Sequence, residues 1–249
     1  MAAKPSYISV PGSWHSAETW SKVTTLLEEQ GLHTCSVTLP TTSGDVTAEF
    51  GDDVKAVQTA IHDQTKQNRD VVLVLHSYGG VVGQSAVKGA TERTDEAGRV
   101  IGIVNVATGF TIAGMAFLDG TGGQPPPIWR LDPSGFAELQ VPARGLFYHD
   151  LPEAEGEEWV RKLTKQSSKA FTEGRDITYA GWKDVPVWHV LTADDKALPL
   201  EMQRVFIDMV KDDITPTVRE VASSHSPMLS RPKELADIIV EAASAFTSA

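Results

Sequence analysis

Residues 71–80 read Val-Val-Leu-Val-Leu-His-Ser-Tyr-Gly-Gly, so an unbroken apolar run leads directly to Ser77 and then to a pair of glycines. Short apolar runs rich in β-branched residues are typical of buried parallel strands. A serine in the tight turn that leaves such a strand is typical of a nucleophile elbow. Ser77 would then stand at the carboxyl edge of a sheet, facing the N-terminal end of a helix that begins near Gly79, and such an end favours negative charge.

The short motif alone leaves two interpretations open. The same residues fit a strand followed by a glycine-rich turn in which the serine has no chemical role. The common Gly-x-Ser-x-Gly pattern also has a small residue two positions before the serine, where this chain has Leu75. A histidine, an acid and an oxyanion-binding loop in the right order elsewhere in the chain would favour the elbow.

Length and charge limit the classes of protein to consider. The chain has 249 residues, which fits one domain with an insertion. Its formal net charge of -11 argues against nucleic acid as the main partner, because nucleic-acid binding needs clustered positive charge. The charge is better suited to keeping the protein in solution.

Cysteine usage and the absence of long apolar segments predict a cytoplasmic protein. The single cysteine, Cys35, cannot form an internal disulfide, and its strand-like neighbours indicate a buried apolar role rather than a reactive thiol. The first residues, Met-Ala-Ala-Lys-Pro-Ser-Tyr, lack the apolar run of a signal peptide. No segment is long enough to span a bilayer, so no membrane partner is expected.

Strand-like and helix-like stretches alternate along most of the chain, which predicts an α/β protein with a mostly parallel sheet of about six strands and helices on both faces. The expected strands are residues 7–10, 34–39, 71–75, 100–106, 187–192 and 217–221. The expected helices are residues 17–30, 46–67, 79–91, 199–211 and 231–246. In the last helix, apolar residues recur at helical spacing from Leu235 to Phe246, so one face should pack against the sheet.

Residues 107–183 break this alternation. They are expected to form a cap insertion over the carboxyl edge of the sheet, whereas residues 1–106 and 184–249 form the core. The insertion contains several glycines, three consecutive prolines and no clear strand, and its helix candidate is residues 153–171.

The insertion is rich in large apolar side chains. Each of them fits a small core of the insertion itself, but together they exceed what such a core requires. Some are therefore expected to line a pocket, because ligand pockets are lined mainly by apolar and aromatic side chains. Phe110, Trp129 and Tyr148 are the candidates.

A serine nucleophile requires a histidine base. A hydroxyl is a weak nucleophile at neutral pH, so a neutral imidazole must take its proton, and a carboxylate must hold that imidazole. His225 fits best because it lies in Ser-Ser-His-Ser-Pro, in the loop between the final expected strand and the final helix. His189 lies inside an expected strand, where a hydrogen-bonded core role is the better interpretation. The other histidines that fit less well are His33, His62, His76 and His149.

The acid is expected in the loop that follows residues 187–192, which reads Ala-Asp-Asp-Lys-Ala-Leu-Pro. Two adjacent aspartates compete for the role. A helix that begins at Pro199 leaves Asp195 in the middle of the loop, which favours it over Asp194. Both would be ordinary turn residues if this loop were the only indication.

Acyl transfer also needs N–H donors aimed at the oxygen that becomes negative, and one such donor is typically worth about 3 kcal/mol in the transition state. One is expected from the amide of Tyr78, directly after the nucleophile. The other is expected from Ser13, in the loop after the first strand, where Gly12 permits a close backbone approach. Trp14 and His15 of the same loop are expected to contact substrate.

With these residues placed, the chain resembles the α/β-hydrolase superfamily over essentially its full length, including the chain order serine, acid, histidine. More narrowly, it is similar to the compact branch that holds the plant methyl-ester esterases and hydroxynitrile lyases, with their fungal and bacterial relatives. Their HGxxHGxxxW loop corresponds to PGSWHSAETW at residues 11–20, where Pro11 replaces the first histidine and Ser16 the second glycine. Their HSxGG elbow appears as HSYGG at 76–80, and their DKxxP acid loop appears as DKALP at 195–199.

The resemblance implies a mostly helical cap, an ester lodged between cap and sheet, and neither a metal nor an organic cofactor. It also favours Asp195 as the acid. The residues and the resemblance together predict a serine hydrolase that cleaves a small carboxylic ester or lactone through an acyl-enzyme, with Ser77, His225 and Asp195 as the triad.

Other functions use the same fold. A carbon–carbon bond hydrolase, a lyase or a cyclase of a biosynthetic pathway would need the same triad. Cyanohydrin cleavage is disfavoured because the lyases of this branch have a lysine directly after the catalytic histidine, where this chain has Ser226. A non-catalytic ligand-binding protein is disfavoured by the complete triad. The oligomeric state stays open, with a homodimer among the options.

Overall fold

The centre of the molecule is a six-stranded sheet. The structure, a computed structural model, describes residues 4–92 and 97–248. The strands are β1 (Ser6–Val10), β2 (His33–Ser36), β3 (Val71–His76), β4 (Val100–Val106), β8 (Val187–Thr192) and β9 (Thr217–Val221). Their order is β2-β1-β3-β4-β8-β9, and every neighbouring pair is parallel. The expected parallel sheet is therefore confirmed.

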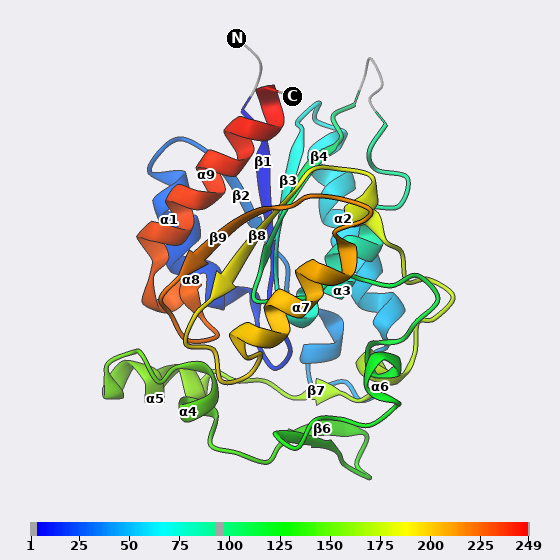
Figure 1. The fold of residues 1–249 in the computed structure, drawn as a ribbon, viewed down its shortest axis with the longest axis vertical. Helices are drawn as coiled ribbons and strands as arrows, with labels where there is room; N and C mark the ends of the chain where they lie inside the picture. Colours follow the sequence, from blue (N-terminus) through cyan, green and yellow to red (C-terminus); the bar gives the residue numbers. More distant parts are fainter. Residues whose placement is uncertain (1–3, 93–96, 249) are drawn as a thin grey trace.

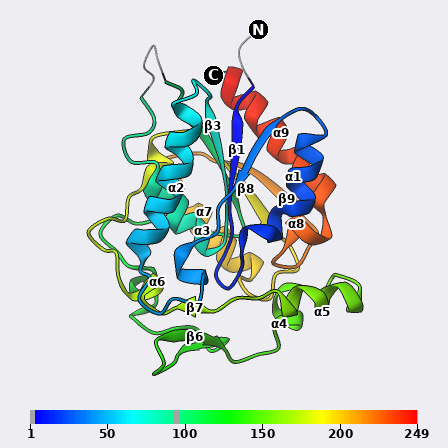
Figure 2. The same cartoon turned by 180° about the vertical axis from the view of Figure 1, so that it is seen from behind.

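Helices cover both faces of this sheet, as expected. They are α1 (Ser21–Glu28), α2 (Phe50–Thr65), α3 (Tyr78–Ala86), α7 (Leu200–Val210), α8 (Pro227–Ser230) and α9 (Pro232–Ser248). Figures 1 and 2 show α1, α8 and α9 on one face and α2, α3 and α7 on the other. No helix in the described part of the chain is both long and apolar enough to cross a membrane.

The core has two layers because side chains alternate between the faces of a strand. In β3, Val72 and Val74 belong to the layer that includes residues of α1 and α9. Leu73 and Leu75 belong to the opposite layer, with residues of α2 and α3. All six residues of β3 are buried, as the apolar run in the sequence predicts.

The main helices differ from their expected limits. The stretch predicted as one helix at 17–30 contains a 3-10 turn, η1 (Ala17–Trp20), before α1 begins. Helix α2 begins at Phe50 because the Asp52 carboxylate accepts a hydrogen bond of 3.0 Å from the amide of Glu49 and caps the first turn.

The insertion contains more strand than the sequence predicts. Its helices are α4 (Ala143–Phe147), α5 (Glu153–Arg161) and α6 (Lys169–Thr172). Three short strands, β5 (Trp129–Leu131), β6 (Phe136–Leu139) and β7 (Gln166–Ser167), form a separate antiparallel sheet. In Figure 1 these elements lie together beyond the carboxyl ends of β1 and β8. The division of the chain at residues 107 and 183 into core and cap stays a prediction.

The helix predicted at 153–171 is wrong between Arg161 and Lys169, where it is interrupted before α6 begins. The chain leaves the helix there, and the amide of Thr164 donates a hydrogen bond of 2.8 Å to the carbonyl of Trp14. Ser167 of β7 then pairs with Phe136 of β6. Tertiary hydrogen bonds therefore outweigh the helical periodicity of this stretch.

The departure of Leu75 from the common elbow pattern is accommodated by a glycine in the helix that follows. A Cβ atom built on Gly83 of α3 would lie only 2.1 Å from Cδ2 of Leu75. In the common pattern, a small residue in the strand makes room for the helix. Here Gly83 in the helix makes room for the large side chain of Leu75 in the strand. Strand β3 and helix α3 keep their close packing through this exchange of sizes.

We expect Gly83→Ala to lower the free energy of unfolding by about 1–3 kcal/mol, because the new methyl group overlaps Leu75. In a Leu75→Ala background the same change should be neutral or stabilising, since alanine is favoured over glycine inside a helix. Urea denaturation of the two single variants and the double variant measures this difference. Gly51→Ala is the control, because its Cβ would meet Ile177 at an ordinary 3.4 Å. Equal losses in both backgrounds would contradict the pairing.

Helix α2 buries a carboxyl group. Asp53 is fully buried and accepts hydrogen bonds from the Thr41 amide (2.9 Å), the Thr41 hydroxyl (2.6 Å) and the Tyr78 hydroxyl (2.8 Å). Burial raises the pKa of Asp53 to about 6, although these three hydrogen bonds favour the ionised form. The carboxylate is therefore costly to the fold at neutral pH.

The raised pKa predicts a pH dependence of stability. The folded state holds the Asp53 proton more tightly than the unfolded chain, so stability falls as the pH rises from about 4 to about 6. The difference corresponds to about 3 kcal/mol at full ionisation. Thermal unfolding should show that Asp53→Asn removes this part of the pH dependence, whereas Asp208→Asn, at an exposed position, retains it. Parallel curves for wild type and Asp53→Asn would contradict the assignment.

Candidate active site

Ser77 lies between β3 and α3 in a strained backbone conformation. Its φ of 52° and ψ of -127° are unusual for a residue other than glycine and cost about 1–3 kcal/mol. The Ser77 amide donates to the carbonyl of Val106 (3.1 Å), and the Thr108 hydroxyl donates to the carbonyl of Ser77 (2.6 Å). These bonds hold the sharp turn, and Ser77 stays partly exposed. The geometry is that of a nucleophile elbow.

The loop after β1 passes against the nucleophile. A Cβ atom built on Gly12 would lie 2.9 Å from Cβ of Ser77 and 3.3 Å from its Oγ. The next residue, Ser13, is buried in this loop. Tyr78 supplies the first amide of α3, and the first amides of a helix have no carbonyl partner within it. The two amides predicted to bind an oxyanion therefore belong to segments that meet at Ser77.

Asp195 and His225 form a buried pair. Nδ1 of His225 lies 2.7 Å from Oδ2 of Asp195, which also accepts the hydroxyl of Thr192 at 2.7 Å. Oδ1 of Asp195 accepts the amides of Ala197 and Leu198, both at 2.8 Å. Burial alone would raise the pKa of Asp195, but the charge of His225 and these hydrogen bonds outweigh it and lower the pKa. Asp194 is exposed, so the structure places Asp195 rather than Asp194 beside the histidine.

Sequence reasoning missed the contact between His76 and His225. The sequence ranks His76 below His225 as the base and gives it no other role, but its Nε2 donates a hydrogen bond of 2.8 Å to the backbone carbonyl of His225, and their rings are 4.7 Å apart. Burial, together with the charges of His225 and His15, lowers the pKa of His76 well below its usual value. The residue before the nucleophile thus supports the loop that carries the base. Its place in the HSxGG motif was the signal available.

No hydrogen bond joins Ser77 Oγ to His225 within the described residues. The base is held next to the elbow by His76, the neighbour of Ser77 in the chain. Hydrogen bonds between nucleophile and base are often long without substrate and shorten in the substrate complex. The arrangement is therefore compatible with proton transfer from Ser77 to His225.

His15 connects the loop after β1 to the insertion. Its Nδ1 lies 2.6 Å from the carbonyl of Ser13, and its Nε2 lies 2.6 Å from the hydroxyl of Tyr148. Because the carbonyl can only accept, Nδ1 carries the proton and the Tyr148 hydroxyl donates to Nε2. Burial lowers the pKa of His15 to about 4, so the ring is neutral at pH 7. Both side chains are buried, which favours a role in joining the two segments over direct exposure to substrate.

The loop that carries His225 is joined to the same part of the insertion. The amide of Ser224 donates a hydrogen bond of 2.9 Å to the carboxylate of Asp150. The hydroxyl of Ser224 donates one of 2.8 Å to the carbonyl of Phe147. Residues 147–150 therefore bind both the loop of the base and, through Tyr148, the loop after β1.

Aromatic residues from both parts of the chain surround this junction. The ring of Trp14 lies 6.0 Å from Trp129, 6.2 Å from Phe147 and 6.2 Å from Phe171. Phe147 in turn lies 5.7 Å from the ring of His225. Trp14 and Trp129 thus pack against each other, and Phe147 contacts both Trp14 and the ring of His225. Contact of the two tryptophans with substrate stays a prediction.

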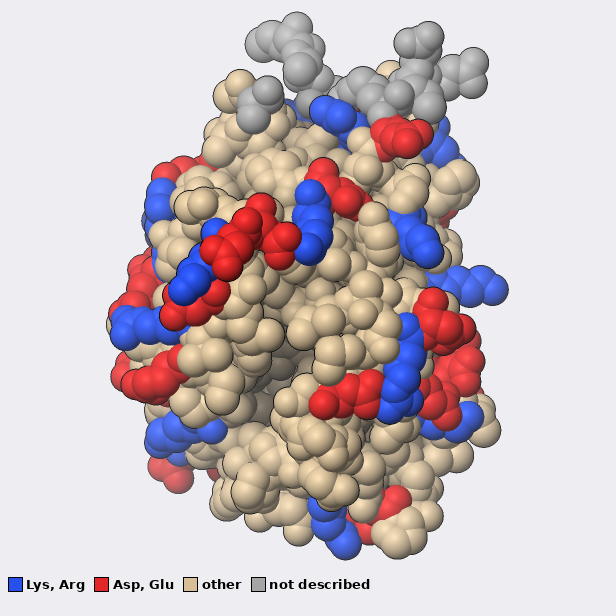
Figure 3. Space-filling view, turned by 45° about the vertical axis from the view of Figure 1, so that its right-hand side comes forward, with Lys and Arg blue, Asp and Glu red and all other residues tan. Residues whose placement is uncertain are grey.

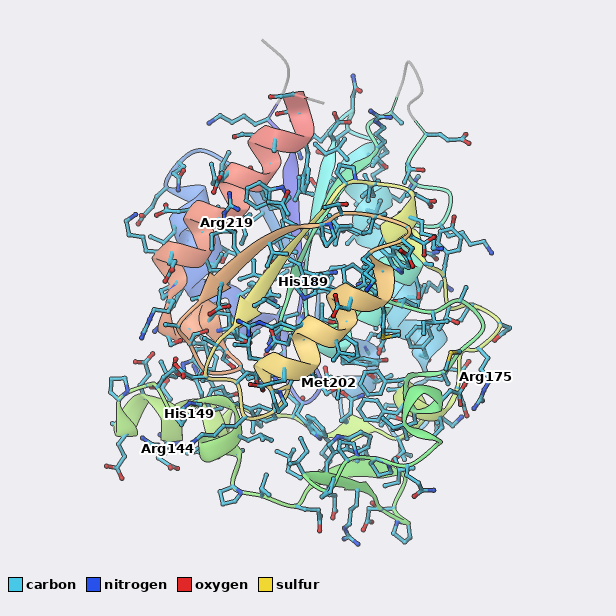
Figure 4. All side chains as sticks on the ribbon, in the orientation of Figure 1. Arg144, His149, Arg175, His189, Met202 and Arg219 are labelled. Carbon is cyan, nitrogen blue, oxygen red and sulfur yellow. The ribbon has the colours of Figure 1, made fainter. Side chains whose placement is uncertain are left out.

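Phe110 lies elsewhere. Its ring stacks on His189 of β8 at 5.2 Å and contacts Trp182 at 5.5 Å, on the face of the sheet covered by α7. His189 is buried, but neither ring nitrogen has a hydrogen-bond partner among the described residues, so the expected hydrogen-bonded role is wrong. Figure 4 shows His189 on the sheet beside α7, which carries Met202.

One face of the molecule is mixed in charge. Figure 3 shows a hollow near the centre of one face, and most of its rim is uncharged, with acidic and basic side chains further out. No group of three or more histidine, cysteine or acidic residues in residues 4–92 and 97–248 could hold a metal ion. A serine, a histidine and a carboxylate in this arrangement are able to perform nucleophilic chemistry.

Comparisons with known proteins identify the family of this chain. The family model of the alpha/beta hydrolase family matches residues 8–238. Methylesterase 1 of Arabidopsis thaliana is 27% identical to this chain, with 98% of this chain and 97% of that protein covered. A probable hydrolase from Phoma sp. is 26% identical, with 96% and 98% covered.

Solved structures have the same fold. An Arabidopsis methylesterase is similar with a TM-score of 0.73 at 21% identity, with 96% of this chain and 99% of that chain covered. Polyneuridine aldehyde esterase is similar with a TM-score of 0.76 at 18% identity, with 96% and 99% covered. The resemblance to the plant methylesterase branch is confirmed. The chain belongs to the alpha/beta hydrolase family, and it is an enzyme of the hydrolase class.

Proposed function

We propose that this enzyme hydrolyses a small carboxylic ester or lactone with Ser77 as nucleophile, His225 as base and Asp195 as the acid that orients it. The observation that carries the proposal is the buried pair of Asp195 and His225 at 2.7 Å, held beside the strained turn at Ser77. Two relatives that are named methylesterase or esterase support an ester as substrate.

The first half of the reaction forms an acyl-enzyme. His225 Nε2 takes the Ser77 hydroxyl proton as Oγ attacks the carbonyl carbon, and the carbonyl oxygen becomes an oxyanion. The amides of Ser13 and Tyr78 donate hydrogen bonds to this oxyanion. When the tetrahedral intermediate collapses, the bond to the alkoxy group breaks, and the imidazolium gives its proton to the departing alcohol.

The second half releases the acid. Water gives a proton to His225 and attacks the acyl carbon, and the new tetrahedral intermediate collapses with return of the proton to Ser77 Oγ. Asp195 remains ionised throughout, because it accepts hydrogen bonds from Thr192, Ala197, Leu198, Gln203 and His225. Its charge stabilises the imidazolium in both halves.

Replacing Ser77 with alanine should lower the turnover of p-nitrophenyl acetate by about four to six orders of magnitude, because the acyl-enzyme can no longer form. Labelling by a fluorophosphonate probe should be lost at the same time. The matched control is Ser85→Ala, which removes a hydroxyl that donates to the carbonyl of Val81 and accepts the amide of Tyr179, and which should retain labelling. Turnover of the ester by Ser77→Ala at the wild-type rate would overturn the proposal.

The two adjacent aspartates provide a second test. Asp195→Asn should lower kcat by about four orders of magnitude, because an amide cannot hold the histidine in the correct tautomer. Asp194→Asn changes an exposed neighbour and should leave kcat near the wild-type value. Steady-state kinetics on the same ester measure both variants. If Asp194→Asn had the larger effect, the assignment of the acid would be wrong.

A further inference from the structure

A continuous chain of buried hydrogen bonds runs from the elbow to the loop after β1. The hydroxyl of Tyr78 donates to Asp53 (2.8 Å), and so does the hydroxyl of Thr41 (2.6 Å). The side-chain amide of Gln166 donates to the Thr41 hydroxyl (2.9 Å), and its oxygen accepts the backbone amide of Trp14 (3.3 Å). The four side chains that form this series of hydrogen bonds, those of Tyr78, Asp53, Thr41 and Gln166, are all buried.

This series of hydrogen bonds joins four separate segments of the protein. Tyr78 begins α3, Asp53 lies in α2, Thr41 lies in the 3-10 turn η2 (Pro40–Thr42), and Gln166 lies in β7 of the insertion. Contacts between segments so far apart in sequence fix how these segments are placed relative to one another. The chain therefore links the core and the insertion beneath the nucleophile.

A contribution to the stability of the fold does not explain why the carboxyl group of Asp53 belongs to this series of hydrogen bonds. The groups that act on Asp53 are Thr41 and Tyr78, which lower its pKa, and the acidic Asp52, which raises it, so no cation among the described residues compensates its burial. A buried carboxylate without a cation is unfavourable to the fold. What Asp53 does provide is two hydrogen bonds that hold Thr41 and one that holds the ring of Tyr78.

Both ends of the chain lie at the predicted oxyanion donors. Tyr78 carries one donor on its own amide. At the other end, the bonded amide of Trp14 belongs to the residue after Ser13, and Trp14 has a φ of 61°, which a residue other than glycine adopts only when its contacts hold it there. The separation of the two donors therefore depends on the series of hydrogen bonds that runs from Tyr78 through Asp53, Thr41 and Gln166 to Trp14.

We propose that Asp53, Thr41 and Gln166 are positioning residues that set the separation of the Ser13 and Tyr78 amides around the oxyanion. The proposal rests on the ester hydrolysis proposed above. Misplaced donors weaken the transition state more than the bound substrate, because the oxyanion exists only after attack. Loss of the chain should therefore lower kcat and leave KM nearly unchanged.

Two substitutions interrupt the chain while leaving the donors themselves in place. Thr41→Val removes the hydroxyl that binds both Asp53 and Gln166, and Tyr78→Phe removes the hydroxyl at the other end. Thr42→Val is the matched control, because Thr42 is a buried neighbour whose hydroxyl, among the described residues, binds the carbonyl of Leu39 and no group of the Asp53–Thr41–Gln166 series. Thr41→Ser restores the hydroxyl and should restore the rate.

The experiment compares turnover of p-nitrophenyl acetate with inhibition by a trifluoromethyl ketone, which forms a tetrahedral adduct with a reactive serine. Thr41→Val and Tyr78→Phe should each lower kcat and weaken the inhibitor by about tenfold, with KM within about twofold of wild type. Because both changes interrupt one chain, the double variant should lose little more than either single variant. Thr42→Val and Thr41→Ser should match the wild type.

Three results would overturn the positioning role: wild-type kcat and inhibition in Thr41→Val and Tyr78→Phe, an equal loss in Thr42→Val, or losses that multiply in the double variant. Each of these leaves the proposed function intact as long as Ser77→Ala is inactive. A wild-type enzyme that neither turns over the ester nor reacts with the fluorophosphonate at Ser77 would instead overturn the proposed function, and the positioning role with it.

Discussion

The backbone of Ser77 is the constraint on which the rest of the site depends. A positive φ at a serine is unfavourable, so the turn exists only because the neighbouring segments leave it room and bind its amide and carbonyl. Gly12 of the loop after β1 leaves room for Ser77, and Gly79 leaves room for the same loop, because a Cβ atom on Gly79 would lie 2.4 Å from the carbonyl oxygen of Pro11. The loop after β1 can approach the hydroxyl closely for the same reason. Strain at the nucleophile and access of the predicted oxyanion donors thus have one structural cause.

The loops that carry the predicted catalytic groups belong to the sheet, but many of their hydrogen-bond partners belong to the insertion. Tyr148 binds His15, Asp150 binds Ser224, and Gln166 binds the amide of Trp14. An insertion that only covered the site would not need these contacts. Changes of sequence in the insertion can therefore alter the rate of the chemical step as well as the shape of the pocket.

The sequence predicted the parts of the fold that have a long, regular signal. The buried run of β3, the alternation of strands and helices, and the choice of Asp195 over Asp194 all follow from local pattern. The strands β5 and β7 are three and two residues long, too short for a period to appear. The contact of His76 with His225 and the pairing of Leu75 with Gly83 depend on where distant or successive elements meet, which a single sequence does not record.

The three histidines near Ser77 differ in what burial does to them. His15 and His76 are buried without a carboxylate partner, so their pKa values fall and both rings are neutral at pH 7. His225 alone is paired with a carboxylate, that of Asp195. The charge of His225 lowers the pKa of both His15 and His76. Because this repulsion is mutual, a charge on either ring would disfavour an imidazolium at His225. Keeping two rings neutral therefore leaves the full charge of Asp195 to stabilise the third when it accepts the proton.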